Sequence, residues 1–109
     1  MNKQQFINLS LDDKLNMIQT INSYDNSLGY LNYYKNDQWF YDEFYKDNPY
    51  QLACDIQHSS NYNFNDDYLF VDVYGNLNTL TSDRLEDIIN MYIDEILTEI
   101  GKYNINIIN

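Results

Sequence analysis

The sequence has little cysteine, proline, glycine or arginine. Its single Cys excludes an internal disulfide framework and any zinc site built on several cysteines. One Pro and three Gly are present, and no Gly-, Ser- or Pro-rich stretch marks a linker, so we expect one domain over residues 1–109. The chain also lacks an apolar run of about 18 residues, the length that a membrane-spanning helix needs. Its N-terminal segment has no apolar run of signal-peptide length, so we expect a reduced, cytoplasmic location.

Basic residues are scarce as well. Six Lys and Arg stand against 17 Asp and Glu, which gives a formal charge of −11. A protein that binds nucleic acid directly needs positive charge to release counterions from the phosphates. Direct nucleic-acid binding is therefore excluded, and binding to an anionic membrane surface is disfavoured for the same reason.

The apolar content is nevertheless enough for a packed core. Leu, Ile, Val and Phe together make up 30 of the 109 residues, well above the roughly 20% below which disorder is expected. Local patterns predict an α+β fold that is mostly helical. We expect a small antiparallel β-hairpin or three-stranded sheet and an amphipathic, acidic C-terminal helix.

Helix-capping residues predict the helices of the first half of the chain. Ser, Asp and Asn side chains accept hydrogen bonds from the first turn of a helix, and Pro is favoured at the first helical position. The expected helices are a short turn over 4–7, a helix behind Ser10 through 24, two short helices within 24–46 of which the second follows Asp37, and a helix behind Asn48 from Pro49 to about His58.

Residues 68–80 have the pattern of a β-hairpin. The segments YLFVDV and LNTL are rich in strand-forming residues. Gly75 and Asn76 lie between them and predict a two-residue turn, because both residues accept positive φ. The tail after Gly101 is either a frayed end or a third strand, and its alternating Ile105 and Ile107 favour the strand.

The strongest helical pattern begins after Ser82, the expected N-cap, and ends at Gly101, the expected C′ residue. Its apolar residues recur at spacings of three and four and predict one buried face: Leu85, Ile88, Ile89, Tyr92, Ile93, Ile96 and Ile100. Of these, we expect Ile89, Ile93 and Ile96 to be core residues.

Acidic residues are concentrated in the C-terminal two-thirds of the chain. No Lys or Arg occurs between Asp47 and Asp83, and none occurs from residue 85 to residue 101. At about 100° per residue, the last helix would place Asp83, Asp87 and Asp94 on one face, with Glu86 at its edge. This face is either the solvated side of an amphipathic helix or a surface that imitates the charge of nucleic acid and occupies a basic groove.

The candidate site residues are therefore carboxylates that would bind a partner. Two of them lie in the Asn-rich loop before the hairpin and the other five on the last helix: Asp66, Asp67, Asp83, Glu86, Asp87, Asp94 and Glu95.

No catalytic, metal-binding or cofactor-binding set is expected. Cys54 and His58 are four residues apart on a predicted helix, but no third ligand accompanies them. The calcium-loop spacing of Asn61, Asn63, Asn65 and Asp72 lacks the central Gly and precedes a strand. Asp66 and Asp67 have no His, Lys or Arg nearby for acid–base work. We therefore do not expect an enzyme.

The segment from Asp47 to Leu77 resembles a family of small acidic proteins of phages and prophages. The resemblance lies in DNPYQLACDI, in NYNFNDDYLFVD and in YGNL. It implies a phage accessory protein with short helices, a hairpin and an acidic C-terminal helix, in the cytoplasm of a bacterial host. Acidic inhibitors of CRISPR effectors and restriction nucleases are common in that group.

The leading hypothesis is accordingly an anti-CRISPR protein that binds a CRISPR effector through the basic groove of that effector. An anti-restriction DNA mimic is the first alternative. A phage adaptor that is acidic only for solubility is the second, and homodimer formation stays open.

Overall fold

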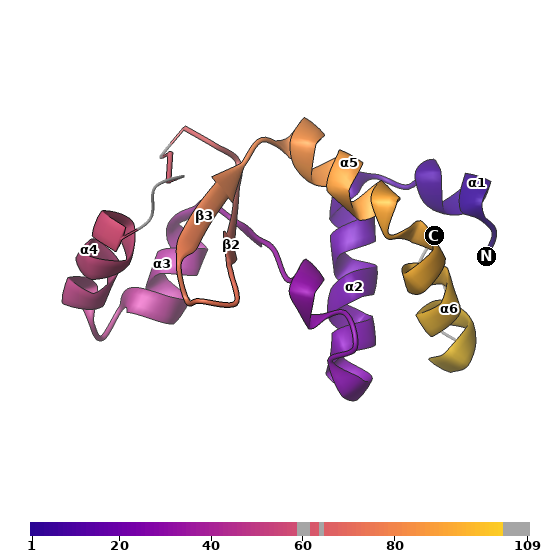
Figure 1. The fold of residues 1–109 in the computed structure, drawn as a ribbon, viewed down its shortest axis with the longest axis horizontal. Coiled ribbons are helices and arrows are strands. Elements are labelled where there is room, and N and C mark those ends of the chain that lie inside the picture. The colour runs from indigo at the N-terminus through magenta and orange to yellow at the C-terminus, as the bar shows by residue number, and fades with distance from the viewer. Residues whose placement is uncertain (59–61, 64, 104–109) are drawn as a thin grey trace. The chain divides into compact units, whose positions relative to one another are not determined.

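The structure is a computed structural model that describes residues 1–58, 62–63 and 65–103 (Figure 1). The chain divides into two compact units. Unit 1 is Met1–Asn32 together with Glu86–Asn109, and unit 2 is Tyr33–Leu85. The single domain expected over residues 1–109 stays a prediction.

The α+β fold class is confirmed. Over the described residues the structure has six α-helices, is 62% helical and contains one three-stranded antiparallel sheet. Within the described residues, no helix combines the length and the apolar character that crossing a membrane requires.

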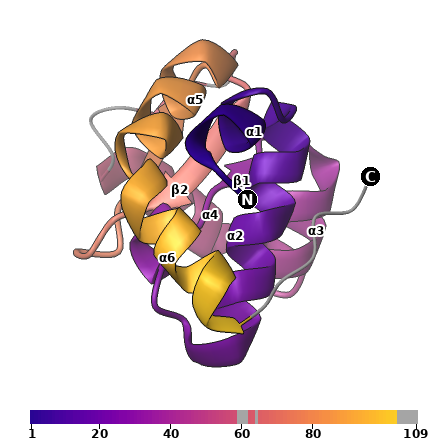
Figure 2. The same cartoon turned by 90° about the vertical axis from the view of Figure 1, so that its right-hand side faces the viewer.

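Unit 1 is helical. It holds α1 (Lys3–Ile7), α2 (Leu11–Asp25), a short 3-10 helix η1 (Gly29–Leu31), the part of α5 (Ser82–Met91) from Glu86 onward, and α6 (Ile93–Tyr103). α6 packs against α1 and α2 (Figure 2). Buried residues from these helices form the core: Phe6, Ile18, Ile21, Ile89 and Ile96.

Local capping explains where α2 begins and ends. The Ser10 hydroxyl accepts a hydrogen bond of 3.1 Å from the Asp13 backbone N–H, as predicted. At the other end Asn26 adopts the left-handed conformation with φ 55° and closes the helix. A Cβ at Gly29 would lie 2.9 Å from the amide end of the Asn26 side chain, so a larger residue there would displace that side chain.

The single long helix expected from residue 83 to residue 100 is wrong. α5 ends at Met91, and the Tyr92 carbonyl accepts the Ile96 N–H to start α6, where Figure 1 shows the chain changing direction. No Pro or Gly stands at this break, so tertiary packing sets it: α6 lies on α1 and α2, and the Tyr92 ring meets Tyr30 edge-on at 5.3 Å.

The expected ends of this helical region also shift. α5 includes Ser82, and the capping oxygens come from Thr81, whose hydroxyl accepts the Arg84 N–H at 3.3 Å. α6 continues through Gly101 to Tyr103. Gly101 keeps the helical conformation and does not act as the C′ residue that the sequence predicted. Of the expected core residues, Ile89 and Ile96 are buried and Ile93 is half-buried.

Unit 2 combines helices with the sheet. It holds β1 (Tyr34–Lys35), α3 (Gln38–Tyr45), α4 (Pro49–His58), β2 (Tyr68–Val71) and β3 (Leu77–Leu80). The helices after Asp37 and Asn48 are confirmed. The strand order is β1-β2-β3 and all pairings are antiparallel. The core of unit 2 consists of Phe40, Tyr45, Leu69 and Leu77.

The hairpin is confirmed, but its two-residue turn is wrong. Val71 pairs with Leu77, so five residues, Asp72–Asn76, make the connection. Only Gly75 has positive φ among them, at 82°. The Asp72 carboxylate organises the loop, because it accepts the N–H groups of Tyr74 and Asn76 at 2.9 Å each.

The third strand of the described sheet is β1. It pairs with β2 through Tyr34 opposite Leu69 and Lys35 opposite Tyr68. The strand expected around Ile105 and Ile107 lies outside the described residues. β1 has only two residues, and its partner lies more than thirty positions further along the chain. It is therefore too short to show the alternating pattern by which a strand is predicted from sequence.

Replacing Ile96 by Ala should lower the free energy of unfolding by about 2–5 kcal/mol, because the change leaves a cavity in the unit 1 core. The half-buried Ile93 is the matched control, and Ile93→Ala should cost less. Urea unfolding followed by circular dichroism measures both. A larger loss for Ile93→Ala would mean that the buried face of α6 is assigned wrongly.

Candidate functional site

Asp66 and Asp67 have structural partners inside unit 2. The Asp66 carboxylate accepts the Thr79 hydroxyl of β3 at 2.6 Å. The Asp67 carboxylate accepts the Ser82 N–H at 3.2 Å, at the start of α5, where the helix dipole favours negative charge. Both side chains therefore fasten the loop before β2, which leaves them less available to a partner than the sequence suggested.

A hollow of about 540 Å³ lies beside these two carboxylates. The residues that line it are mostly polar. They come from the end of β1 and the residues after it, which include Lys35 and Asp37, and from the loop before β2. The Asn36 amide donates to the Asp66 carbonyl at 2.9 Å and so joins the two walls. The hollow holds charges of both signs, unlike the purely negative loop expected from sequence.

Asp83 and Asp87 are exposed on α5. They are four residues apart, so their side chains lie one above the other on the helix surface. Neither makes an ion pair with any residue that the structure describes. Asp83 and Asp87 are therefore exposed carboxylates without an ion pair to the described residues.

Glu86 differs from its neighbours because a buried lysine faces it. Lys14 of α2 has a fully buried side chain, and its Nζ lies 3.7 Å from a Glu86 carboxylate oxygen and 3.2 Å from the Asn90 amide oxygen. The same ammonium group lies 5.5 Å from the centre of the Phe6 ring. Sequence analysis missed this contact, which neutralises one of the predicted site residues.

Asp94 and Glu95 are exposed in the first turn of α6. Asp94 pairs with Lys3 at 3.0 Å, and both side chains are mostly exposed, at 74% and 63%. Such a surface pair contributes about 0–1 kcal/mol and opens easily. Glu95 makes no ion pair within the described ranges, and beside burial its charge raises the pKa of Tyr30.

A second hollow, of about 400 Å³, is lined by Asp94, Glu95 and Glu99. Its other lining residues include Leu28 and Tyr30. The hollow is open and acidic. Nothing in the described part of the chain fills it.

The seven predicted residues therefore fall into two groups. Asp66, Asp67 and Asp83 belong to unit 2, and Glu86, Asp87, Asp94 and Glu95 belong to unit 1. The common face predicted for Asp83, Asp87 and Asp94 assumed an uninterrupted helix, so the break at Tyr92 removes its basis. Of the seven, Asp67, Asp83, Asp87 and Glu95 are exposed and outside every described ion pair. Asp67 differs from the other three because its carboxylate accepts the Ser82 N–H.

Candidate chemistry is sparse in the described residues. They contain no group of three or more His, Cys, Asp and Glu that could hold a metal ion. Cys54 is half-buried on α4. The Asn61 position of the calcium-loop spacing lies outside the described residues.

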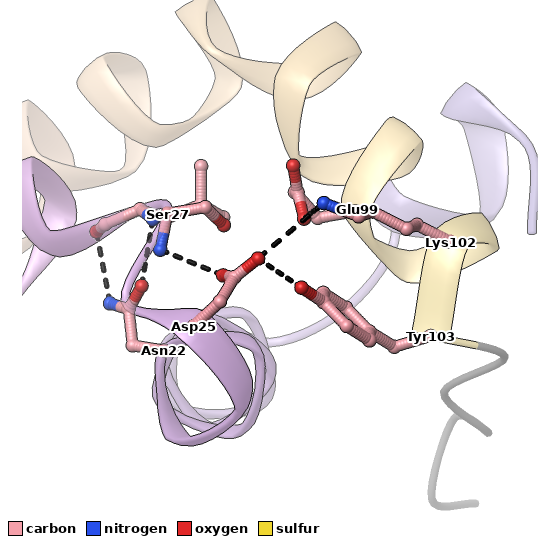
Figure 3. Close-up of polar contacts among 7 residues, drawn as sticks. Asn22, Asp25, Ser27, Glu99, Lys102 and Tyr103 are labelled. Atoms are coloured by element: carbon pink, nitrogen blue, oxygen red, sulfur yellow. Dashed lines mark hydrogen bonds and ion pairs between the residues drawn. The ribbon is translucent and has the colours of Figure 1, made fainter.

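A polar cluster that sequence analysis missed joins the end of α2 to the end of α6 (Figure 3). Asp25 accepts a short hydrogen bond from the Tyr103 hydroxyl, and Lys102 lies 3.5 Å from the same carboxylate oxygen. The Tyr103 ring stacks on Tyr24 at 4.8 Å. Asp25 also accepts the Ser27 N–H at 2.9 Å. The contact between Asp25 and Tyr103 spans 78 positions, so no local pattern could indicate it.

Hydrogen bonding makes Asp25 an unusually strong acid. The Tyr103 hydroxyl, followed by Ser27 and the charge of Lys102, lowers the pKa of Asp25 from 3.8 to about 2 against the opposing effect of burial. Because the pKa is lowered on folding, the ionised form stabilises the fold above about pH 4. That contribution is lost as the pH falls from about 4 to about 2.

Neutralising Glu86 should destabilise the fold, whereas neutralising Asp87 should not. Glu86→Gln leaves the buried Lys14 ammonium group without a counter-ion, at a cost of about 1–2 kcal/mol; a fully buried pair would cost more, but the Glu86 side chain is 43% exposed. Asp87→Asn should stay within about 0.5 kcal/mol of the parent. Equal stabilities of the two variants in urea unfolding would contradict this role of Lys14.

Tyr103→Phe should raise the pKa of Asp25 towards 3.8, because it removes the largest cause of the shift. Tyr24→Phe keeps the ring stack and the Tyr103 hydroxyl and should leave that pKa near 2. A carboxyl-carbon NMR titration reads both variants directly. The α2–α6 cluster is refuted if Asp25 titrates at its ordinary value in the parent protein.

No protein-family model matches the chain, and neither does any curated protein or solved structure with which it was compared. The resemblance to acidic phage proteins thus stays a prediction.

Proposed function

We propose that the protein is a phage-encoded inhibitor of a bacterial defence nuclease, in its most specific form an anti-CRISPR protein. It acts by stoichiometric binding and not by catalysis. Its exposed carboxylates occupy a basic groove of the effector that otherwise holds guide RNA or target DNA. The partner is thus a protein, and nucleic acid is the competitor.

The observation that carries this proposal is the exposed pair Asp83 and Asp87 on α5. Like charges four residues apart destabilise a helix by a few tenths of a kcal/mol. Neither carboxylate recovers that cost through an ion pair with the described residues, although Lys14 and Lys3 do so for Glu86 and Asp94. A negative pair that no described ion pair engages is available to a basic partner.

Charge density limits how α5 can imitate a duplex. Four residues of helix rise about 6 Å, whereas duplex DNA carries one charge per roughly 1.7 Å of axis. The Asp83–Asp87 pair alone is therefore too sparse. We infer that two further carboxylates, Glu95 and, once its exposed ion pair with Lys3 opens, Asp94, add long-range attraction to a basic effector.

The net charge supports the same mechanism. At −11 the chain attracts any basic groove over several ångströms at low salt, which raises the association rate. An anti-restriction DNA mimic would use identical physics on a different nuclease. The two alternatives differ in the identity of the partner and share the binding surface.

A non-mimic adaptor is the second candidate, because large aromatic side chains of unit 2 are exposed. Trp39 and Phe44 of α3 are 54% and 51% exposed. Exposed aromatic residues in contact with one another are typical of protein–protein interfaces. An adaptor would bind through these rings, tolerate salt and keep its affinity when carboxylates of α5 are neutralised.

A competition assay with an isolated effector tests the proposal. Protein added before guide RNA or target DNA should block loading, whereas nucleic acid added first should protect the effector. The double variant Asp83→Asn/Asp87→Asn should lose roughly tenfold or more in inhibition, since charge pairs across an interface contribute about 1.5 kcal/mol or more.

The double variant Asp13→Asn/Asp47→Asn is the matched control. Each double variant removes two charges, from −11 to −9, so a difference between them reports position and not net charge. Both should keep the circular dichroism spectrum of the parent. Simultaneous binding of protein and nucleic acid at unchanged affinity would rule out the mimic and leave the adaptor.

A further inference from the structure

Three aromatic side chains of unit 2 form one contiguous, partly exposed cluster. Tyr34 of β1 lies 6.4 Å from Trp39 and 5.2 Å from Phe44, measured between ring centres. Trp39 and Phe44 of α3 meet edge-to-face at 6.5 Å. We call Tyr34, Trp39 and Phe44 the α3 aromatic cluster.

The core of unit 2 holds this cluster in place. Phe40, which is 1% exposed, lies beneath it, 4.7 Å from Phe44 and 5.4 Å from Tyr34 between ring centres. The Asp37 side chain caps α3 at its first turn by accepting the Phe40 N–H at 3.3 Å. Because the rings rest on a buried residue of a capped helix, the cluster itself loses little conformational entropy when a partner binds it.

The exposure of these rings has a thermodynamic cost. Half of Trp39 and half of Phe44 face water although both side chains could bury about 150–250 Å². Trp and Tyr are the residues most often found at the energetic centres of interfaces. A contiguous exposed aromatic cluster on a rigid helix therefore indicates a contact surface.

The charges beside the cluster indicate what binds there. Asp42 and Glu43 are exposed and follow Trp39 by three and four residues, which makes them its neighbours on the helix surface. α3 itself contains no Lys or Arg, and Lys46 follows it as the C-cap residue. An aromatic face next to two carboxylates suits a planar cation, which can stack on the indole and form paired hydrogen bonds with a carboxylate.

We propose that the α3 aromatic cluster binds an arginine-bearing segment of a protein partner. A guanidinium group stacks on Trp39, and Glu43 or Asp42 accepts its N–H groups. Arginine fits better than lysine, because the ammonium group of lysine is compact, strongly hydrated and not planar. This surface lies in unit 2, and the proposal stands whether or not the carboxylates of α5 imitate nucleic acid.

The chain contains a single Trp, so tryptophan emission reports on Trp39 and hence on this surface alone. Titration with a peptide of alternating arginine and glycine should change the Trp39 emission in a saturable way. A lysine–glycine peptide of the same length and charge should bind about five- to tenfold more weakly, as expected from the loss of one stacked guanidinium group.

Two variants and one control make the test specific. Phe44→Ala and Glu43→Gln should each weaken binding of the arginine peptide severalfold. Tyr50→Ser removes a ring of α4 that is 79% exposed and should leave binding unchanged. Circular dichroism checks that each variant folds, and Glu43→Gln keeps the test decisive should Phe44→Ala unfold.

Three results would overturn the proposal. They are an unchanged Trp39 emission, equal affinity for the lysine peptide, and undiminished binding by Glu43→Gln. Equal affinity for both peptides would show attraction to the net charge of −11 and no recognition of guanidinium.

Discussion

The buried ammonium group of Lys14 is the contact on which the arrangement of unit 1 depends. A lysine with no exposed surface is tolerated only when its charge is paired and hydrogen-bonded. Glu86 and Asn90 of α5 meet that requirement, and the Phe6 ring of α1 covers the remaining side. Three helices thus converge on one charge of α2. This constraint fixes which face of α5 turns inward and leaves Asp87, one residue beyond Glu86, facing solvent.

The acidic residues consequently have two kinds of role. Some stabilise the fold: Asp66 accepts the Thr79 hydroxyl, Asp72 organises the hairpin loop, and Asp25 joins the ends of α2 and α6. Others, such as Asp83 and Asp87, have no stabilising contact among the described residues. A net charge cannot separate these roles, but hydrogen-bond partners can. The proposed binding residues are therefore fewer than the sequence implied, and they centre on the exposed carboxylates that form no described ion pair.

Local features of the fold were predictable from sequence, whereas features that depend on distant residues were not. Ser10, Asp37 and Asn48 act within one helical turn, so their capping roles follow from the residues themselves. Strand β1 needs β2 as a partner, and the break at Tyr92 needs α1 and α2 to pack against. The candidate site follows the same division. The exposure of Asp83 and Asp87 follows from helical period, while the neutralisation of Glu86 required a lysine 72 positions earlier in the chain.

The most direct test of the central claim is the salt dependence of binding to an isolated effector. Competition for a basic groove exchanges the carboxylates of this protein for small anions held near that groove, so affinity should fall steeply as salt rises. We expect the logarithm of the association constant to decline linearly with the logarithm of salt concentration, and Asp83→Asn/Asp87→Asn to make that decline shallower. An affinity that is unchanged across the physiological range of salt would contradict the account, because a surface that works by charge cannot be indifferent to screening.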